Sequence, residues 1–177
     1  MRKVIVYMLI SLDGVAEDPN TFITEFDEAM DENLAEVIGS QDTVLLGRRM
    51  YEEWSRYWPT SDIEPFASFI NTVQKYVATS RPLDGDWPNA AVIDGELPEF
   101  VARLKQQAGE DIGVHGSISV AQQLLAAGLV DRLRLVVAPA LQFEGRRLFE
   151  GGAPIRLALD RSVTSPAGYL LLDLSVR

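Results

Sequence analysis

The stretch Thr43-Val44-Leu45-Leu46-Gly47-Arg48-Arg49-Met50-Tyr51-Glu52 joins two different patterns in one short segment. Its first four residues are apolar or β-branched and predict a short buried strand, which stops at Gly47. From Arg48 to Tyr57 the apolar side chains recur at helical spacing, and Pro59 ends that segment. A buried strand that passes directly into a helix is the repeating unit of an α/β fold.

The same alternation extends over the rest of the chain. Apolar runs predict further strands at 4–10, 75–79, 90–93, 111–115 and 132–138. Apolar residues three and four positions apart predict helices over 22–38, from 61 or 62 to 73, over 96–107, and beyond 117 to a C-terminal cap at Gly128. The tail, 155–165 and 169–176, predicts a hairpin around Pro166-Ala167-Gly168.

Together these elements predict the fold class. Strands that alternate with helices and finish in a hairpin indicate an α/β sandwich, with a mixed sheet that is mostly parallel and has an antiparallel C-terminal edge. The length of 177 residues is close to the ~150 typical of one domain. No linker or internal repeat divides the sequence, so we predict a single domain over 1–177.

Composition narrows the range of functions. The chain is 47% apolar, and its 16 basic and 26 acidic residues give a net charge of −10. It has no cysteine and one histidine, His115, which excludes thiolate zinc sites and thiol nucleophiles; no metal site is predicted. The acidic charge argues against nucleic-acid binding, and no apolar run approaches the ~18 residues of a membrane span. We expect a cytoplasmic protein with a small-molecule substrate and no membrane or nucleic-acid partner.

Three predicted strand ends carry residues suited to binding anions. They are Gly47-Arg48-Arg49, Thr79-Ser80-Arg81 and Gly116-Ser117-Ile118. Ligands of open α/β sheets bind at the carboxyl ends of strands, where helix N-termini offer free N–H groups and an arginine can fork onto a phosphate. Thirteen of the 16 basic residues are arginine, which suits phosphate recognition, although biased genomic composition would give the same count.

Each of these turns also has a purely structural interpretation. Gly47 can simply make a tight turn, Ser80-Arg81-Pro82 can be a solvated loop, and Ser117 or Ser119 can be a helix N-cap. The fingerprints of a standard Rossmann site, a P-loop and the common hydrolase elbow are all absent. We interpret His115 as a strand-end residue rather than a catalytic base.

The chain resembles the dihydrofolate-reductase-like superfamily, and within it the stand-alone relatives of the C-terminal reductase domain of the bifunctional riboflavin-biosynthesis deaminase-reductase. The motifs that carry the resemblance are Ser11-Leu12-Asp13-Gly14-Val15, the stretch from Val44 to Glu52, Val114-His115-Gly116-Ser117, the stretch from Ala127 to Leu135 with Pro139, and Leu148-Phe149-Glu150-Gly151-Gly152. They extend over nearly all of the chain, and none of them identifies the substrate.

The resemblance implies a three-layer αβα sandwich with a dihydrofolate-reductase-like mixed sheet, in an enzyme that binds NADPH along the strand ends. By motif position, Gly47, Arg48 and Arg49 are similar to a phosphate-contacting turn. The loop around the adenosine 2′-phosphate corresponds by motif position to Thr79, Ser80 and Arg81. The turn that binds the pyrophosphate corresponds to Gly116, Ser117 and Ile118. Asp13 and Gly14 would lie beside the nicotinamide and substrate, with Asp13 positioning the substrate or a water; Asp13-Gly14 as a plain turn is an equally open interpretation.

Three functions are open at this point. The first is an NADPH-dependent reductase of a small heterocyclic or carbonyl-type substrate. The second is the riboflavin-pathway step itself, reduction of a ribosylaminopyrimidine phosphate, for which Arg146 and Arg147 are candidate phosphate ligands. The third is a module that binds a nucleotide without turnover. True dihydrofolate reductases carry a Pro-Trp-x-Leu stretch and a helix-borne carboxylate that have no clean counterpart around 20–28, so dihydrofolate is not the expected substrate.

The predicted hairpin also indicates a homodimer. Leu170, Leu171, Leu172 and Leu174 make the last strand apolar on both faces, so one face can line the core while the other needs a cover.

Overall fold

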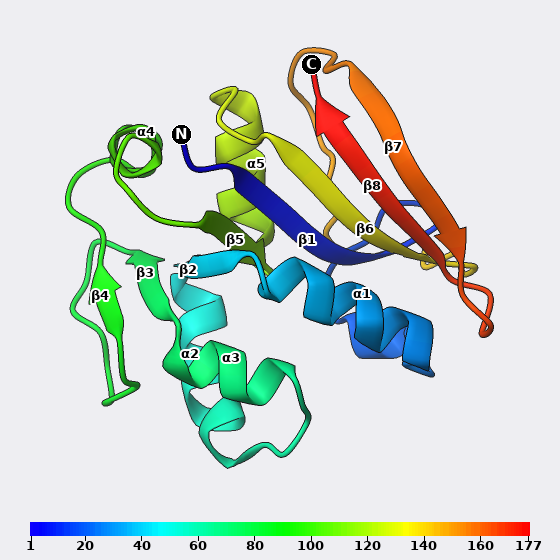
Figure 1. Cartoon of the computed structure of the whole chain (residues 1–177), viewed down its shortest axis with the longest axis horizontal. Coiled ribbons are helices and arrows are strands. Elements are labelled where there is room, and N and C mark those ends of the chain that lie inside the picture. Colours follow the sequence, from blue (N-terminus) through cyan, green and yellow to red (C-terminus); the bar gives the residue numbers. More distant parts are fainter.

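The eight strands pair in the order β4-β3-β2-β5-β1-β6-β8-β7 in a computed structural model that describes residues 1–177 (Figure 1). Their bounds are β1 Val4–Ser11, β2 Gln41–Gly47, β3 Gln74–Ala78, β4 Ala90–Val92, β5 Asp111–His115, β6 Arg132–Ala138, β7 Leu157–Thr164 and β8 Leu170–Val176. All pairings from β4 to β6 are parallel, and β6–β8 and β8–β7 are antiparallel. The predicted mixed sheet with its C-terminal hairpin is confirmed.

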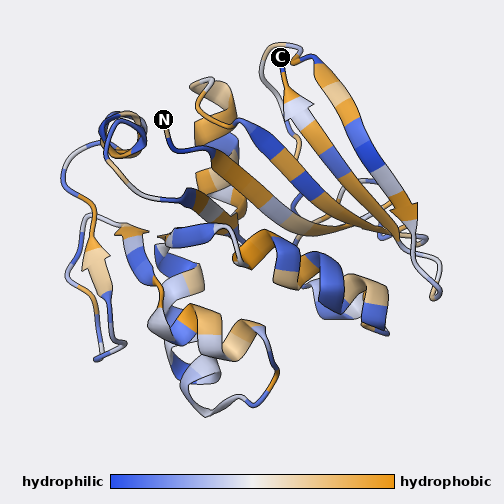
Figure 2. Cartoon of the chain, viewed as in Figure 1, coloured by the Kyte–Doolittle hydropathy of each residue, from blue (hydrophilic) through white to orange (hydrophobic).

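Helices cover both faces of this sheet, as predicted. Their bounds are α1 Glu28–Ile38, α2 Arg48–Tyr57, α3 Phe66–Thr72, α4 Leu97–Lys105 and α5 Ile118–Ala126, with short 3₁₀ turns at Pro19–Thr21 and Trp58–Thr60. One apolar core joins α4 and α5 to the sheet, and a second joins α1, α2 and α3 to the opposite face. Figure 2 shows β1 as hydrophobic along most of its length, whereas the neighbouring β6 alternates hydrophilic and hydrophobic residues in its first half. None of the helices has the length and hydrophobicity to cross a membrane.

Two helices begin later than the sequence pattern predicts. The helix expected from residue 22 begins at Glu28, because the Asp27 carboxylate accepts a hydrogen bond from the Met30 amide and caps the helix there. The helix expected from 61 or 62 begins at Phe66, directly after Pro65. A proline disfavours helical geometry in the residue before it, so the chain cannot become helical through Glu64.

Other boundaries move by one or two residues. The third strand is Gln74–Ala78, which leaves Thr79 just beyond its end, and β7 starts at Leu157 rather than 155. Helix α4 ends at Lys105, earlier than predicted. Gly128 has a φ of +65° just after α5, which confirms the left-handed cap expected from glycine at this position.

A buried lysine fixes the loop between β3 and β4. The Lys75 side chain is fully buried, and its Nζ donates to the carbonyls of Ile70 and Val73, both 2.8 Å away. The same ammonium lies 4.6 Å from the centre of the Trp87 ring, and burial lowers the pKa of Lys75 to about 8. Trp87 also donates to Asn71, so the far end of this loop is anchored to α3.

The hairpin leaves one face of β8 and β7 open. Leu171 is buried in the core beneath α1, whereas Leu157, Leu159 and Leu170 are 41%, 59% and 39% exposed. These exposed leucines lie on the α5 side of the sheet, where no helix covers the last two strands (Figure 1). A second copy of the chain that brings the same face together would cover them.

We therefore expect a homodimer formed through this face. Light scattering at micromolar concentration should give twice the 19.6 kDa monomer mass. Leu159→Arg should give monomers, because it places a charge in the buried contact. Ile63→Arg, at a similarly exposed residue outside the hairpin, should leave the dimer intact. A monomeric wild-type mass would rule the dimer out.

Candidate functional site

The predicted site residues lie along one edge of the sheet, because β3, β2, β5 and β1 all run in the same direction. Gly47 pairs with Ala78 of β3, and Leu45 pairs with Val114 of β5, so the turns that follow these strands are neighbours. Tyr7 pairs with His115, where β5 ends, and β1 continues to Ser11. Four further residues at ~3.3 Å each extend β1 roughly 13 Å past the end of β5. The edge is therefore indented at β5.

A hydrogen bond ties two of these turns together. The Gly47 amide donates to the Ser117 hydroxyl at 3.0 Å, and Ser117 is buried. Ser117 occupies the N-cap position of α5, but its side chain makes no bond to the helix amides. Ser117 is therefore the N-cap residue by position, but its hydroxyl joins the end of β2 to the start of α5 instead of capping the helix amides.

The two glycines at this edge differ in what the fold demands of them. Gly116 has a φ of +69°, and a Cβ there would come within 2.9 Å of the Met50 side chain. Gly47 has an ordinary φ of −81°, and a Cβ would meet nothing closer than 3.6 Å. The backbone at Gly47 therefore does not require glycine, whereas the backbone at Gly116 does.

The Thr79-Ser80-Arg81 turn lies against Arg48. The guanidinium Nη1 donates to the carbonyl of Pro82 at 2.6 Å and reaches the Arg81 carbonyl at 3.4 Å and the Thr79 hydroxyl at 3.5 Å. Thr79 Oγ1 also accepts from the Arg81 amide. Ser80 and Arg81 are exposed, and the Arg81 side chain makes no hydrogen bond or ion pair within the chain.

Both arginines at the start of α2 are paired with carboxylates. Arg48 bonds Glu52 at 2.5 Å and Asp84 at 2.7 Å, and the bond to Glu52 raises the pKa of Arg48. Arg49 is 3.0 Å from Glu53. It also reaches Glu17, in the segment after β1, at 3.1 Å, so it connects α2 to that segment.

Asp13 is a structural anchor as well as a candidate site residue. Its carboxylate accepts from Ser11 Oγ at 2.6 Å and from the amides of Gln142 and Phe143 at 3.0 and 2.8 Å. The Ser11 bond, followed by that from Gln142, lowers the pKa of Asp13 to about 2. Asp13 is therefore ionised near neutral pH, where it can orient a group but cannot supply a proton.

The two arginines proposed for a substrate phosphate differ in availability. Arg147 Nε donates to the Asp13 carbonyl at 3.2 Å, and its Nη2 donates to the carbonyl of Phe143. Arg146 is exposed; its backbone amide bonds Glu17, and its guanidinium has no partner within the chain. Gly14 has a φ of +85°, and its carbonyl accepts a hydrogen bond from the Leu148 amide. This bond joins the turn after β1 to the segment that follows Arg147.

His115 does not face the site. Its side chain is 2% exposed, and its ring packs at a tilt against the rings of Tyr7, Phe66 and Phe69. Its Nε2 lies 2.8 Å from Gln41 Oε1. Burial lowers the pKa of His115 to about 3, so the ring is neutral at physiological pH. This confirms its interpretation as a strand-end residue. The peptide bond between His115 and Gly116 is trans; the one cis peptide bond in the chain joins Glu64 and Pro65.

Comparison with known proteins decides the family. The RibD C-terminal domain matches residues 2–171. This chain belongs to that family. The uncharacterized Bacillus subtilis proteins YyaP and YwjB are 28% and 26% identical to it, over 84% of this chain and 80% and 83% of theirs.

Solved structures with the same fold match nearly the whole of this chain. A Shewanella sp. PV-4 protein provisionally assigned to riboflavin biosynthesis has a TM-score of 0.80 at 15% identity, over 99% of both chains. A pyrimidine reductase-like protein from Corynebacterium diphtheriae has a TM-score of 0.71 at 18% identity, over 99% of this chain and 92% of its own. At sequence identities of 15% and 18%, these similarities show a shared fold.

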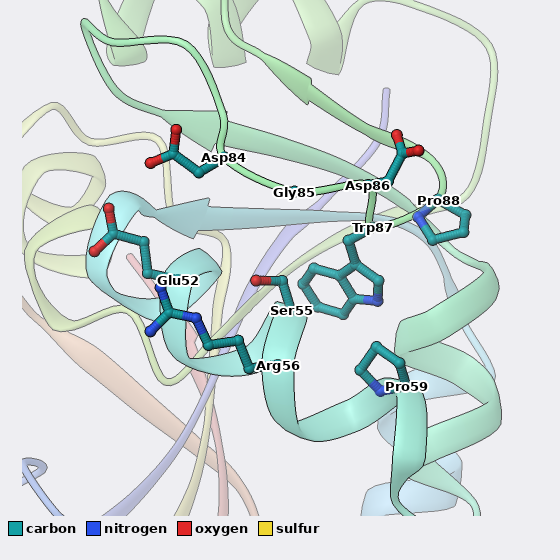
Figure 3. A pocket seen from close by; sticks show the side chains of 9 residues that line it. All are labelled: Glu52, Ser55, Arg56, Pro59, Asp84, Gly85, Asp86, Trp87 and Pro88. Carbon is teal, nitrogen blue, oxygen red and sulfur yellow. The ribbon is translucent and has the colours of Figure 1, made fainter.

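A cavity of about 410 Å³ lies beside this edge of the family domain (Figure 3). It is lined by Glu52, Ser55, Arg56, Pro59, Asp84, Gly85, Asp86, Trp87 and Pro88. None of these is a predicted site residue, but Glu52 and Asp84 are the carboxylate partners of Arg48. The cavity therefore adjoins the predicted 2′-phosphate loop without containing it.

Sequence reasoning missed the carboxylates that pair with the site arginines. Glu52 and Glu53 follow Arg48 and Arg49 by four residues, a spacing that places oppositely charged side chains together on a helix and was available in the sequence. Glu17 and Asp84 come from loops more than 30 residues away from their partners, and no local pattern indicates them.

Ser117→Ala tests the link between the two turns. It leaves the Gly47 amide without its partner, so we expect the free energy of unfolding to fall by about 1–2 kcal/mol in urea denaturation. Ser119→Ala is the matched control, because Ser119 is exposed and its hydroxyl makes no hydrogen bond; it should change stability by less than about 0.5 kcal/mol. Equal effects of the two substitutions would contradict a structural role for the Ser117 hydroxyl.

Proposed function

We propose that the chain is an NADPH-dependent reductase of a small heterocyclic or carbonyl-type substrate. The observation that carries the proposal is the meeting of three turns, 47–49, 79–81 and 116–118, along one edge of the sheet. Their donors are arginine guanidinium groups, hydroxyls and the first amides of α2 and α5. Donors of this kind suit a ligand with several phosphates.

Family membership supports the reductase class. The RibD C-terminal domain family contains the reductase half of the bifunctional riboflavin enzyme, which this sequence resembles. The fold neighbour from Corynebacterium is itself described as pyrimidine reductase-like. These likenesses support an oxidoreductase function, and the choice of NADPH and of substrate rests on the residues of this chain.

The residues fit a dinucleotide that extends along the edge. Arg81, with its free guanidinium, and the Thr79 and Ser80 hydroxyls would hold the 2′-phosphate. The turn at Gly47 and the start of α5 at Gly116-Ser117-Ile118 would hold the pyrophosphate, because α2 and α5 begin directly after β2 and β5 and their N-termini favour a negative charge. When bound, NADPH supplies a hydride to an electrophilic C=N or C=O carbon.

The substrate would lie toward β1. Asp13 and Gly14 form the turn after this strand, and ionised Asp13 fixes the amides of Gln142 and Phe143 and can orient a water. Because Asp13 stays ionised, the proton that completes the reduction comes from that water or from the substrate's surroundings rather than from the carboxyl group.

The riboflavin-pathway reduction of a ribosylaminopyrimidine phosphate is the second candidate. It is favoured by the unpaired guanidinium of Arg146 at the β1 side of the site, which is free to bind a substrate phosphate. Oxidation of NADPH on addition of that substrate would select this reaction from a panel that also contains pterins. NADPH binding with no oxidation across the panel would favour a nucleotide-binding module.

Arg81→Ala tests the cofactor assignment. Hydrogen bonds to charged groups contribute about 1.5–3 kcal/mol, so we expect roughly tenfold to hundredfold weaker NADPH binding and little change for NADH. Arg48→Ala should also weaken NADPH, but Arg48 holds the loop itself, so Arg81 gives the cleaner result. Tryptophan quenching with both dinucleotides measures the affinities.

Arg156→Ala provides the control for charge. Arg156 is exposed just before β7, far from this edge in strand order, and its removal changes the net charge equally. It should affect neither dinucleotide. Equal affinity of the wild type for NADPH and NADH, or equal losses in Arg81→Ala, would overturn the assignment.

A further inference from the structure

Arg48 is already engaged by carboxylates at the position proposed for the 2′-phosphate. Nε donates to Glu52 at 2.5 Å, Nη1 to the Pro82 carbonyl at 2.6 Å, and Nη2 to Asp84 at 2.7 Å. Phosphate binding needs the same forked donors. A phosphate at this turn and the Asp84 carboxylate therefore compete for one guanidinium.

The two carboxylate partners are held to different degrees. Glu52 is one helical turn from Arg48 on α2, and its side chain is 38% exposed. Asp84 belongs to the loop after β3, and its side chain is 79% exposed. Ion pairs at such exposed sites are weak and screened by solvent, so a dianion with several bonds can displace Asp84.

The rest of the loop stays in place when this pair breaks. Tyr51 donates its hydroxyl to the Asp84 carbonyl at 3.2 Å, so the backbone at residue 84 is held independently of the carboxylate. Trp87 is fixed by Asn71 and Lys75. A rotation of the Asp84 side chain is enough to free Nη2 of Arg48 for a phosphate, while Nε and Nη1 keep their bonds to Glu52 and the Pro82 carbonyl, and no loop movement is required.

We propose that Asp84 is an affinity- and specificity-determining residue that occupies Arg48 in the free protein and gives way to the 2′-phosphate of the cofactor. The proposal rests on the proposed function. Asp84 lowers the affinity for 2′-phosphorylated nucleotides in two ways, by pairing with Arg48 and by repelling the incoming dianion. A nucleotide without the 2′-phosphate does not encounter this competition.

The experiment compares two acidic residues of the same loop, Asp84 and Asp86. Asp84→Asn removes the competing charge, and Asp86→Asn removes the same charge two residues along the loop, where the carboxylate makes no ion pair or hydrogen bond. Each variant and the wild type are titrated calorimetrically at low salt with 2′,5′-ADP, 5′-ADP, NADPH and NADH. Thermal unfolding of each variant verifies the fold, and Asp84→Ala serves as a second variant.

We expect Asp84→Asn to bind 2′,5′-ADP and NADPH roughly three- to tenfold more tightly than the wild type, with 5′-ADP and NADH unchanged. Asp86→Asn should change every affinity by less than about twofold. Equal effects of the two substitutions, or weaker 2′,5′-ADP binding by Asp84→Asn and Asp84→Ala, would overturn the role of Asp84 alone. A wild type that binds neither NADPH nor 2′,5′-ADP would overturn the proposed function as well.

Discussion

The parallel pairing of β3, β2, β5 and β1 is the constraint on which the site depends. Parallel strands bring their carboxyl ends to one edge of the sheet. Residues 11–14, 47–49, 79–81 and 116–118 therefore become neighbours in space although they are far apart in the sequence. Because β5 ends earlier than β1, this edge of the sheet is indented at β5. The hydrogen bond from the Gly47 amide to the Ser117 hydroxyl joins the turns that follow β2 and β5 at this indentation. Helices pack on both faces of this group of strands, and β1, β2 and β3 contribute side chains to both apolar cores.

Charge at this edge is largely neutralised within the chain. Arg48 and Arg49 are paired with carboxylates, and Arg147 bonds backbone carbonyls, which leaves the guanidinium groups of Arg81 and Arg146 free. In a protein with a net charge of −10, unpaired cations are the groups that can attract an anionic ligand. Arg81 follows β3, whereas Arg146 lies near the turn after β1, so the two free guanidinium groups belong to different parts of this edge.

The fold was predictable to a large extent because strongly periodic segments specify their own elements. The strand at 43–46 and the helix that follows it have a clear apolar pattern and were placed to within two residues. The late starts of α1 and α3 depended on a cap at Asp27 and on Pro65, local effects that override periodicity. The site was predictable only as a set of turns. The pairing of Arg48 and Arg49 with Glu52 and Glu53 follows from helical spacing, but their contacts with Asp84 and Glu17 arise from tertiary structure alone.

The most direct test of the central claim is a crystal structure of the protein with NADP⁺. The account predicts that the dinucleotide extends along the carboxyl edge, with its pyrophosphate at Gly47 and Gly116-Ser117 and its 2′-phosphate within hydrogen-bond distance of Arg81. Density for the dinucleotide elsewhere, for example in the cavity beside Trp87, or a 2′-phosphate pointing into solvent away from the Thr79-Ser80-Arg81 turn, would contradict it.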